Sequence, residues 1–270
     1  MNFDLSNKVA VLTGAGGAIS GEIAIAMAQQ GAAVALWDIN LGRVETKANS
    51  IRENGGIAQA IYCDVTNKDS VTKAIEDTIR HFQTIDILLN GAGGSSPKTT
   101  TSDEQSFFDL AVEDMNFVSN LNYMSKVIIS QGVGKIFAKK GTGNIINITS
   151  IAGISPLTRA LTYSDSKAAA NSFTKWLAVH MAQNYSNKIR VNAIAPGFIL
   201  TDQNRFLLTD EKTGEMTNRG KKIIDSVPMA RYGEASEICG VALWLASDQS
   251  SFVTGAIVPV DGGLTAYVGV

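Results

Sequence analysis

The sequence predicts an α/β protein with a doubly wound parallel sheet of about seven strands, formed by a single domain. Three observations indicate this fold class: seven short apolar segments of strand length, helical repeats between them, and a glycine-rich turn after the first segment. The chain has 270 residues, enough for one large α/β domain. Its 45% hydrophobic and 18% charged residues are typical of globular proteins. The net charge of -2 gives no reason to expect nucleic acid or an anionic membrane as a partner.

The apolar segments have the composition of buried strands. They are almost continuously apolar rather than alternating, as expected of parallel strands that are covered on both faces. Helical spacing follows the first segment at Ile19, Ile23 and Met27, and a similar repeat precedes the fourth. This alternation of strand and helix favours right-handed crossovers in one sheet. The segments are Lys8–Leu12, Ala33–Trp37, Ala58–Cys63, Ile85–Asn90, Asn144–Thr149, Ile189–Ile194 and Ala256–Val260.

No linker, repeat or low-complexity segment divides the chain, so residues 1–270 are expected to form one domain. Residues 197–227 interrupt the alternation, because they carry charge, Thr and Asn but little regular apolar pattern. A segment of that length inside a compact domain is usually a lid or a binding segment. We expect a substrate-binding lid here, and a disordered surface loop is the alternative.

The N-terminus has no signal-peptide pattern, and no stretch approaches the roughly 20 apolar residues of a membrane span. Cys63 and Cys239 are far apart and match no metal or redox spacing. His81 and His180 have no ligand-spaced neighbours. We therefore expect a cytoplasmic protein with reduced thiols and no metal, which binds a small molecule.

The stretch TGAGGAISG, residues 13–21, predicts a phosphate-binding turn, although its glycines fit neither common spacing. Gly14, Gly16 and Gly17 permit positive φ and a close approach of ligand to backbone. The helix expected from Ala18 would offer free N–H groups and the positive end of its dipole. Ligands of doubly wound sheets bind at the carboxyl ends of the strands, where this turn lies. A purely structural glycine turn is the alternative.

Acidic residues end the next two strand segments. Asp38 follows the glycine turn by about 20 residues, the spacing at which a carboxylate binds an adenosine ribose. Such a carboxylate would repel a 2′-phosphate, and no Lys or Arg stands at 15–17 or 39–40. NAD is therefore favoured over NADP, with a simple turn cap as the other interpretation of Asp38. Asp64 and Val65 could contact the adenine edge.

Tyr163 and Lys167 stand four residues apart on an expected helix and therefore share one face. A phenol with a pKa near ~10 is a poor acid–base catalyst at neutral pH. A neighbouring ammonium stabilises the phenolate and lowers that pKa. Ser150 follows the fifth strand segment. An exposed helix face would give the same Tyr–Lys pair, so the pair becomes informative only beside the other motifs.

These motifs, in this order and along the whole chain, resemble those of the short-chain dehydrogenase/reductase family. The resemblance implies a Rossmann-type sheet, a homotetramer, and direct hydride transfer between NAD(H) and a substrate carbon. It rests on the TG turn, Asp38, Asp64-Val65, Asn90-Gly91-Ala92-Gly93, Ser150, Tyr163-x-x-x-Lys167 and Pro196-Gly197-x-x-x-Thr201.

The resemblance also implies residue roles. Tyr163 would be the general acid or base, Ser150 would hold the substrate oxygen, and Lys167 would bind the nicotinamide ribose. The relay asparagine of the family maps to Asn122, with Asn120 as a near neighbour that could be confused with it. The expected cofactor contacts are Gly14, Gly16, Gly17, Ala18, Ile19, Asp38, Asp64, Val65, Asn90, Ala92, Tyr163, Lys167, Pro196, Gly197, Ile199 and Thr201.

Polar residues suit a polyhydroxylated acid as the substrate. Arg159 could pair with a carboxylate, although a surface or interface salt bridge is an equal alternative. Gly94, Asn204 and Arg205 add hydrogen-bonding groups beside Ser150.

Four segments resemble the D-mannonate oxidoreductase, or fructuronate reductase, branch of the family. This resemblance implies reduction of D-fructuronate to D-mannonate with NADH. A gluconate or sorbitol-type polyol dehydrogenase and a non-catalytic NAD-binding sensor are the alternatives. The segments are NGAGGSSPKTTT, PLTRALTYSDSK, APGFILTDQNRFLL and PVDGGLTAYVGV.

Overall fold

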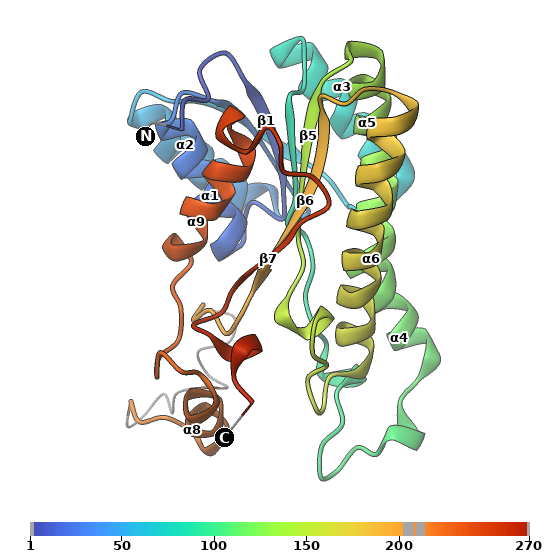
Figure 1. The fold of residues 1–270 in the computed structure, drawn as a ribbon, viewed down its shortest axis with the longest axis vertical. Helices are drawn as coiled ribbons and strands as arrows, with labels where there is room; N and C mark the ends of the chain where they lie inside the picture. The colour runs from blue at the N-terminus through green and yellow to red at the C-terminus, as the bar shows by residue number, and fades with distance from the viewer. Residues whose placement is uncertain (1–2, 202–207, 209–213, 269–270) are drawn as a thin grey trace.

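The computed structural model describes residues 3–201, 208 and 214–268, and places one central sheet between two layers of helices (Figure 1). The strands are β1 (Val9–Thr13), β2 (Ala33–Asp38), β3 (Ile57–Tyr62), β4 (Ile87–Asn90), β5 (Gly143–Ile148), β6 (Ile189–Pro196) and β7 (Ile257–Val260). The helices are α1 (Ala18–Gln29), α2 (Leu41–Glu53), α3 (Lys68–Phe82), α4 (Val112–Ser119), α5 (Ser125–Lys140), α6 (Leu161–Asn184), α8 (Asn218–Ser226) and α9 (Ser236–Ala246).

All strand pairs are parallel, in the order β3-β2-β1-β4-β5-β6-β7. The predicted fold class is therefore confirmed. Every residue of β1, β5 and β6 is buried, which explains their continuous apolar pattern. The fourth strand begins at Ile87, two residues later than predicted. The strand order reverses between β1 and β4, so a cleft for ligands is expected at their carboxyl ends.

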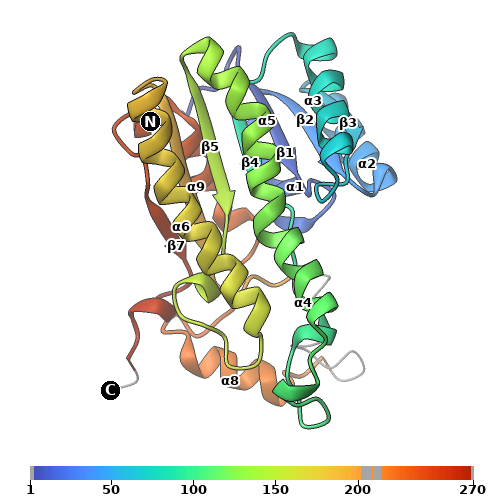
Figure 2. The same ribbon diagram turned by 90° about the vertical axis from the view of Figure 1, so that its right-hand side faces the viewer.

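Helices cover both faces of the sheet (Figure 2). Helices α1, α2 and α9 pack on one face, where Ile23 and Met27 of α1 are fully buried as their spacing predicts. Helices α3, α5 and α6 pack on the other face, with Phe137 of α5 at its centre. The helix α3 begins where the Asn67 side chain accepts hydrogen bonds from the N–H groups of Asp69 and Ser70. The apolar contacts between the sheet and the helices on its two faces therefore hold the strand ends in place.

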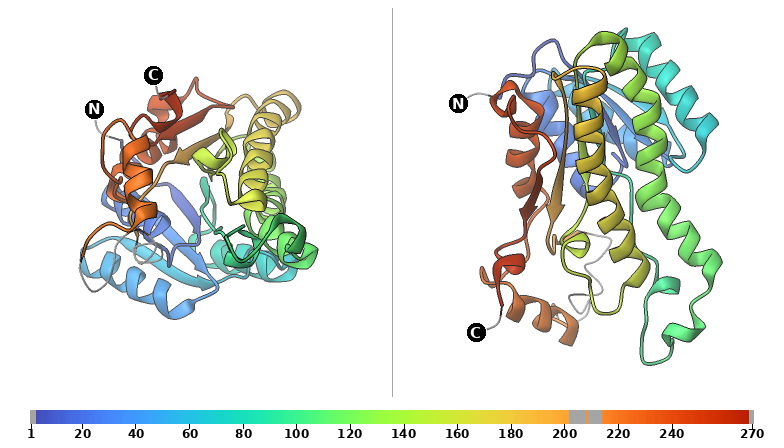
Figure 3. Two further views of the ribbon diagram at one scale, coloured as in Figure 1. Left: turned by 90° about the horizontal axis from the view of Figure 1, so that it is seen from below. Right: turned by 45° about the vertical axis from the view of Figure 1, so that its right-hand side comes forward.

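The predicted lid, residues 197–227, contains a helix that the sequence pattern did not indicate. Helix α8 is capped by the Thr217 side chain, which accepts a hydrogen bond from the Gly220 N–H. Its Ile223 packs with Leu208 and Val227 in a small cluster apart from the main core. Seen from below, α8 lies beneath the carboxyl ends of the strands (Figure 3). A helix of this length shows too few apolar positions for its period to be recognised.

Both cysteines are free. Burial raises the pKa of Cys63 to about 12 and that of Cys239 to about 11, so neither is a reactive thiolate at neutral pH. Across residues 3–201, 208 and 214–268, the structure contains no helix both long and apolar enough to cross a bilayer.

The turns after β1 and β4 are joined by one buried hydroxyl. Thr13 is fully buried, and its Oγ1 accepts hydrogen bonds from the N–H groups of Gly91 at 3.0 Å and Ala92 at 3.1 Å. The Ala92 N–H thus depends on this side-chain acceptor, while the Gly91 N–H also bonds to Leu89 O at 3.1 Å. This link holds the two turns at a fixed separation.

Replacing Thr13 by Val should destabilise the protein, because the shape is kept while the Ala92 N–H loses its acceptor and the Gly91 N–H keeps only Leu89 O. We expect Thr13→Val to lower the free energy of unfolding by about 1–3 kcal/mol. Thr72→Val is the matched control, since the exposed Thr72 hydroxyl bonds only to Lys68 O within its own helix. Guanidinium denaturation of both variants checks this, and equal stabilities would contradict the role of Thr13.

Candidate active site

The glycine turn after β1 has the shape of an anion cradle. Gly14 adopts φ +65°, which favours glycine. Gly16 needs space instead, because a β-carbon there would lie 3.0 Å from Asp38 Oδ2. Helix α1 starts at Gly17 with no side-chain cap, so its first N–H groups point to the open end of the turn. These features fit the pyrophosphate of a dinucleotide.

The departures from the common glycine spacing leave this backbone intact. Ala18 and Ser20 lie inside α1, and neither adopts positive φ. Ser20 is buried, and its Oγ lies against Gly91, where no β-carbon would fit. Of the three glycines that permit positive φ, only Gly14 adopts it.

Asp38 lies at the carboxyl end of β2, beside the glycine turn. Its carboxylate accepts hydrogen bonds from the N–H groups of Gly16 at 3.0 Å and Asn40 at 2.8 Å. Arg43, in the first turn of α2, lies next to the same place, since a β-carbon on Gly16 would be 3.1 Å from Arg43 Cβ. The search for Lys or Arg at positions 15–17 and 39–40 of the sequence missed this basic side chain. It becomes visible only when α2 is folded against the turn.

Asp64 is largely engaged by its own neighbours. Its N–H donates to Ser70 Oγ at 2.9 Å, and its Oδ1 accepts from the Thr66 N–H at 2.9 Å. Val65 is buried at the same strand end. Adenine contacts through the N–H of Asp64 would therefore compete with Ser70.

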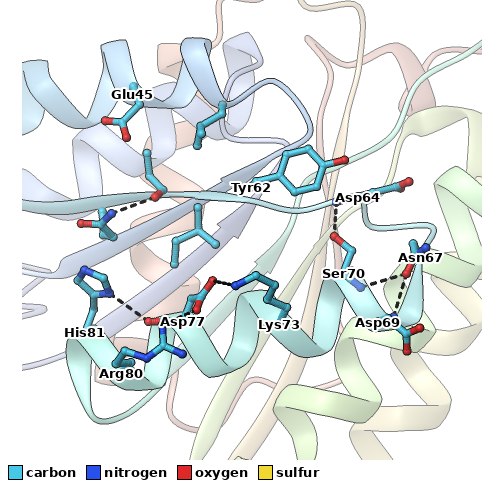
Figure 4. A pocket seen from close by; sticks show the side chains of 14 residues that line it. Glu45, Tyr62, Asp64, Asn67, Asp69, Ser70, Lys73, Asp77, Arg80 and His81 are labelled. Atoms are coloured by element: carbon cyan, nitrogen blue, oxygen red, sulfur yellow. Dashed lines mark hydrogen bonds and ion pairs between the residues drawn. The ribbon is translucent and has the colours of Figure 1, made fainter.

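A hollow of about 850 Å³ lies beside Asp64, but on the outer edge of the sheet (Figure 4). Residues of α2, β3 and α3 line it, among them Tyr62, Asp77 and Arg80. The hollow lies at β3, which is an edge strand of the sheet. Ser150 follows β5, and the strands β2, β1 and β4 lie between β3 and β5. The hollow is therefore separate from the catalytic residues.

The structure brings Ser150, Tyr163 and Lys167 together. Ser150 follows β5, and its hydroxyl accepts a hydrogen bond from the Ala152 N–H at 3.1 Å. Tyr163 lies in the first turn of α6, near enough to the Ser150 side chain for that hydroxyl to affect its pKa. Lys167 follows one turn later, with Nζ 5.4 Å from the centre of the Tyr163 ring and 3.2 Å from Ile148 O. The i, i+4 spacing thus acts as the sequence predicted.

The electrostatics of these groups follow from burial. Burial raises the pKa of Tyr163, and the hydrogen bond from Ser150 opposes that rise. Burial lowers the pKa of Lys167 to about 8. The expected lowering of the Tyr163 pKa by Lys167 is not seen, because the ammonium lies over the ring rather than at the phenol oxygen. At neutral pH the phenol is therefore protonated and able to donate.

Asn122 is fully buried in a short π-helical turn, Asn120–Met124, between α4 and α5. Its side chain makes two bonds to one residue: Oδ1 accepts from the Gly94 N–H at 3.0 Å, and Nδ2 donates to Gly94 O at 2.7 Å. Asn120 is exposed, so the two candidate asparagines are clearly distinguished. π-helical turns often mark functional sites, because they re-aim a side chain.

One buried residue at this end was missed by sequence reasoning. Lys126 is only 1% exposed, and its Nζ donates to Ala92 O at 3.1 Å. Its position in a helix would ordinarily indicate an exposed lysine, and no motif singles it out.

The predicted substrate residues are less closely grouped. Gly94 borders the site through Asn122, while the exposed Arg159 forms an ion pair with Asp103 at 3.0 Å. Asn204 and Arg205 lie outside the described residues. Among the remaining cofactor candidates, Asn90 and Ala92 flank the turn after β4, Ile19 follows Ala18 in α1, and Pro196, Gly197, Ile199 and Thr201 follow one another at the end of β6.

Nearly the whole chain matches a known family. Residues 14–265 match the model described as enoyl-(acyl carrier protein) reductase. A relative from Haemophilus influenzae, named only as an uncharacterized oxidoreductase, is 40% identical over 280 residues, covering 100% of this chain and 97% of that protein.

Three solved structures are similar over almost the full length. A candidate D-mannonate oxidoreductase from Haemophilus influenza with bound NAD has a TM-score of 0.93 and 40% identity, covering 99% of this chain and 98% of that one. A 7α-hydroxysteroid dehydrogenase with NADH and 7-oxo glycochenodeoxycholic acid has a TM-score of 0.86 and 35% identity, covering 97% and 96%. A gluconate 5-dehydrogenase from Burkholderia cenocepacia with NADP and tartrate has a TM-score of 0.87 and 30% identity, covering 99% and 98%. The chain belongs to the short-chain dehydrogenase/reductase family.

Proposed function

We propose that the protein is an NAD(H)-dependent oxidoreductase for sugar acids, with the reduction of D-fructuronate to D-mannonate as its reaction. The observation that carries the oxidoreductase assignment is the convergence of Ser150, Tyr163 and Lys167 at the carboxyl end of the sheet. The substrate assignment is supported by the similarity to the candidate D-mannonate oxidoreductase and by the four segments that resemble that branch.

The geometry divides the reaction among three side chains. Ser150 would hold the substrate oxygen, and Tyr163, which lies close to Ser150, would donate its proton to that oxygen as the ketone is reduced. When bound, the nicotinamide supplies the hydride. The Lys167 ammonium would bind ribose hydroxyls, and its Nζ, 5.4 Å from the centre of the Tyr163 ring, supports a role in balancing the charge of the phenolate that Tyr163 becomes. Asn122 keeps the turn at Gly94 in position beside them.

NAD is the proposed cofactor, held with its pyrophosphate at the glycine turn and its adenosine ribose at Asp38. The Asp38 carboxylate lies within hydrogen-bond distance of that turn and opposes a 2′-phosphate electrostatically. Arg43 lies beside the same turn, and its positive charge would offset part of this repulsion of a 2′-phosphate. Comparing kcat/KM for NADH and NADPH tests the preference, and equal values would contradict the role of Asp38.

The substrate end is proposed to combine Arg159 and Gly94 with the lid, residues 197–227, which includes Asn204 and Arg205. The position of α8 below the strand ends supports a covering role (Figure 3). Arg159 would break its ion pair with Asp103 and form one with the substrate carboxylate instead.

A panel of hexuronates, aldonates, polyols and a 7-hydroxysteroid, followed by NADH absorbance, tests the assignment. Turnover of D-fructuronate with NADH supports it. Turnover restricted to gluconate or polyols would favour the alternative function, a gluconate or sorbitol-type polyol dehydrogenase. The similarity to a gluconate 5-dehydrogenase supports that alternative. NADH binding without any turnover would indicate a non-catalytic sensor.

We also propose a cytoplasmic homotetramer. Exposed apolar side chains at two separate places support the assembly, since two isologous contacts per chain build a tetramer. One includes Trp176 and Val179 of α6, and the other includes Phe252 near the edge strand β7. Two free thiols suit a reducing compartment. Light scattering after gel filtration tests the tetramer directly.

Tyr163→Phe should lower kcat by about 100-fold or more while leaving NADH binding unchanged. Only the proton donor is removed, and the ring that packs near Lys167 is kept. Tyr123→Phe is the matched control from the neighbouring π-helical turn. NADH fluorescence titration and steady-state rates check both, and near-normal turnover of Tyr163→Phe would refute the assignment.

The reduction rate should fall as pH rises through about 8. Burial lowers the pKa of Lys167 to about 8, so its charge is lost above that pH, whereas Tyr163 keeps its proton because its own pKa is raised. A pH profile of kcat/KM measures this. In Lys167→Arg, whose guanidinium stays charged, the decline near pH 8 should disappear from the remaining activity. A decline that persists would assign it to another group.

Arg159→Ala should raise KM for a carboxylated substrate by roughly tenfold or more, because a hydrogen bond to a charged group contributes about 1.5–3 kcal/mol. A neutral analogue should be affected much less. Asp103→Asn is the control, since it breaks the same surface ion pair while keeping Arg159. Equal effects of Arg159→Ala on charged and neutral substrates would make Arg159 a structural residue.

A further inference from the structure

Lys126 is a buried lysine that the reaction described above does not use. It is the second residue of α5, it is 1% exposed, and its Nζ donates to Ala92 O at 3.1 Å. Within the described part of the chain, no carboxylate forms an ion pair with Lys126 or Lys167. An ammonium in such a place is costly, because burial removes water without supplying a counter-charge. Lys126 is therefore held most easily as a neutral amine.

The two buried amines approach the same turn from two helices. Lys126 reaches Ala92 from α5. Lys167 reaches the next residue from α6, since a β-carbon on Gly93 would lie 3.4 Å from Lys167 Nζ. Burial, and then the charge on Lys167, lower the pKa of Lys126 well below its ordinary value. The protonation states of the two amines are thus coupled.

Few other titratable groups face this pair. Residues 90–94 of the turn include none. Tyr163 faces Lys167 from the same helix, and Asp165 of that helix is exposed. Tyr123 lies in the π-helical turn before α5. Since no carboxylate of residues 3–201, 208 or 214–268 forms an ion pair with either lysine, the pair takes up one proton readily and the second only at lower pH.

We propose that Lys126 is a positioning residue for catalysis, a neutral amine that accepts a proton from the Lys167 ammonium and so restores the reactive form of Tyr163 during alcohol oxidation. This inference rests on the proposed oxidoreductase reaction. In that direction the substrate O–H bond breaks and its proton joins the Tyr163 phenolate. Lys167 then transfers one N–H proton to the lone pair of Lys126, and the Tyr163 O–H proton replaces it through a bridging water, because Lys167 Nζ lies over the ring and not at the phenol oxygen. Lys126 finally releases its extra proton to water, and reduction reverses each transfer.

The solvent deuterium isotope effect on kcat tests this transfer. Lys126→Met has nearly the same length without the amine, and Lys135→Met, on the exposed side of α5, is the matched control. With the alcohol that the substrate panel identifies, we expect Lys126→Met to lower kcat about tenfold or more. Its solvent isotope effect should rise above that of the wild type, because proton transfer becomes rate-limiting. An unchanged isotope effect overturns the proposal whatever the rate, since a purely structural loss would not alter it.

A second measurement needs no substrate. Below about pH 10.4 the unfolded chain keeps Lys126 protonated, while the folded chain keeps it neutral down to its lowered pKa. The unfolded state binds the extra proton in that window, so wild-type stability rises with pH there, and Lys126→Met removes this contribution. The melting temperature of Lys126→Met should therefore exceed that of the wild type by more at pH 7 than at pH 9.5. If no alcohol turns over, the proposed function fails. If the difference in melting temperature between Lys126→Met and the wild type does not change with pH, the inference about Lys126 fails by itself.

Discussion

The whole site depends on a close contact between the turns that follow β1 and β4. A β-carbon on Gly14 would lie 2.8 Å from Ala92 Cα, so main chain packs directly on main chain. The Thr13 hydroxyl completes the contact by accepting two N–H groups of the second turn. Because β1 and β4 are neighbours in the sheet, the cofactor turn and the catalytic end keep one relative position. Gly14 is required here both by its positive φ and by the closeness of Ala92.

The same turn after β4 is the platform for the catalytic side chains. Asn122 holds Gly94 through two hydrogen bonds, Lys167 lies beside Gly93, and Lys126 bonds to Ala92 O. Side chains from three helical segments therefore converge on consecutive residues of one turn. The two lysines have no acidic partner in the described residues, so burial determines their charge. Such costly groups are typical of sites where protons move.

The sequence predicts what depends on order and composition, and fails where packing between distant elements decides. Strand segments were predictable because burial on both faces leaves a continuous apolar pattern. The Tyr163–Lys167 pair was predictable because one helix fixes its geometry. Arg43 was missed because its closeness to Gly16 arises only when α2 folds onto the turn. Lys126 was missed because a helical lysine is normally exposed, and only the packing of α5 shows otherwise.

Under the proposed function, charge rather than shape would decide among substrates through Arg159. Arg159 is paired with Asp103, and both side chains are exposed. An exposed ion pair contributes only about 0–1 kcal/mol, so a substrate carboxylate held by other contacts can replace Asp103 at little cost. A neutral polyol cannot make this exchange and would leave the Arg159–Asp103 pair in place. The weakness of this surface pair would then be what allows Arg159 to distinguish a sugar acid from a polyol of the same length.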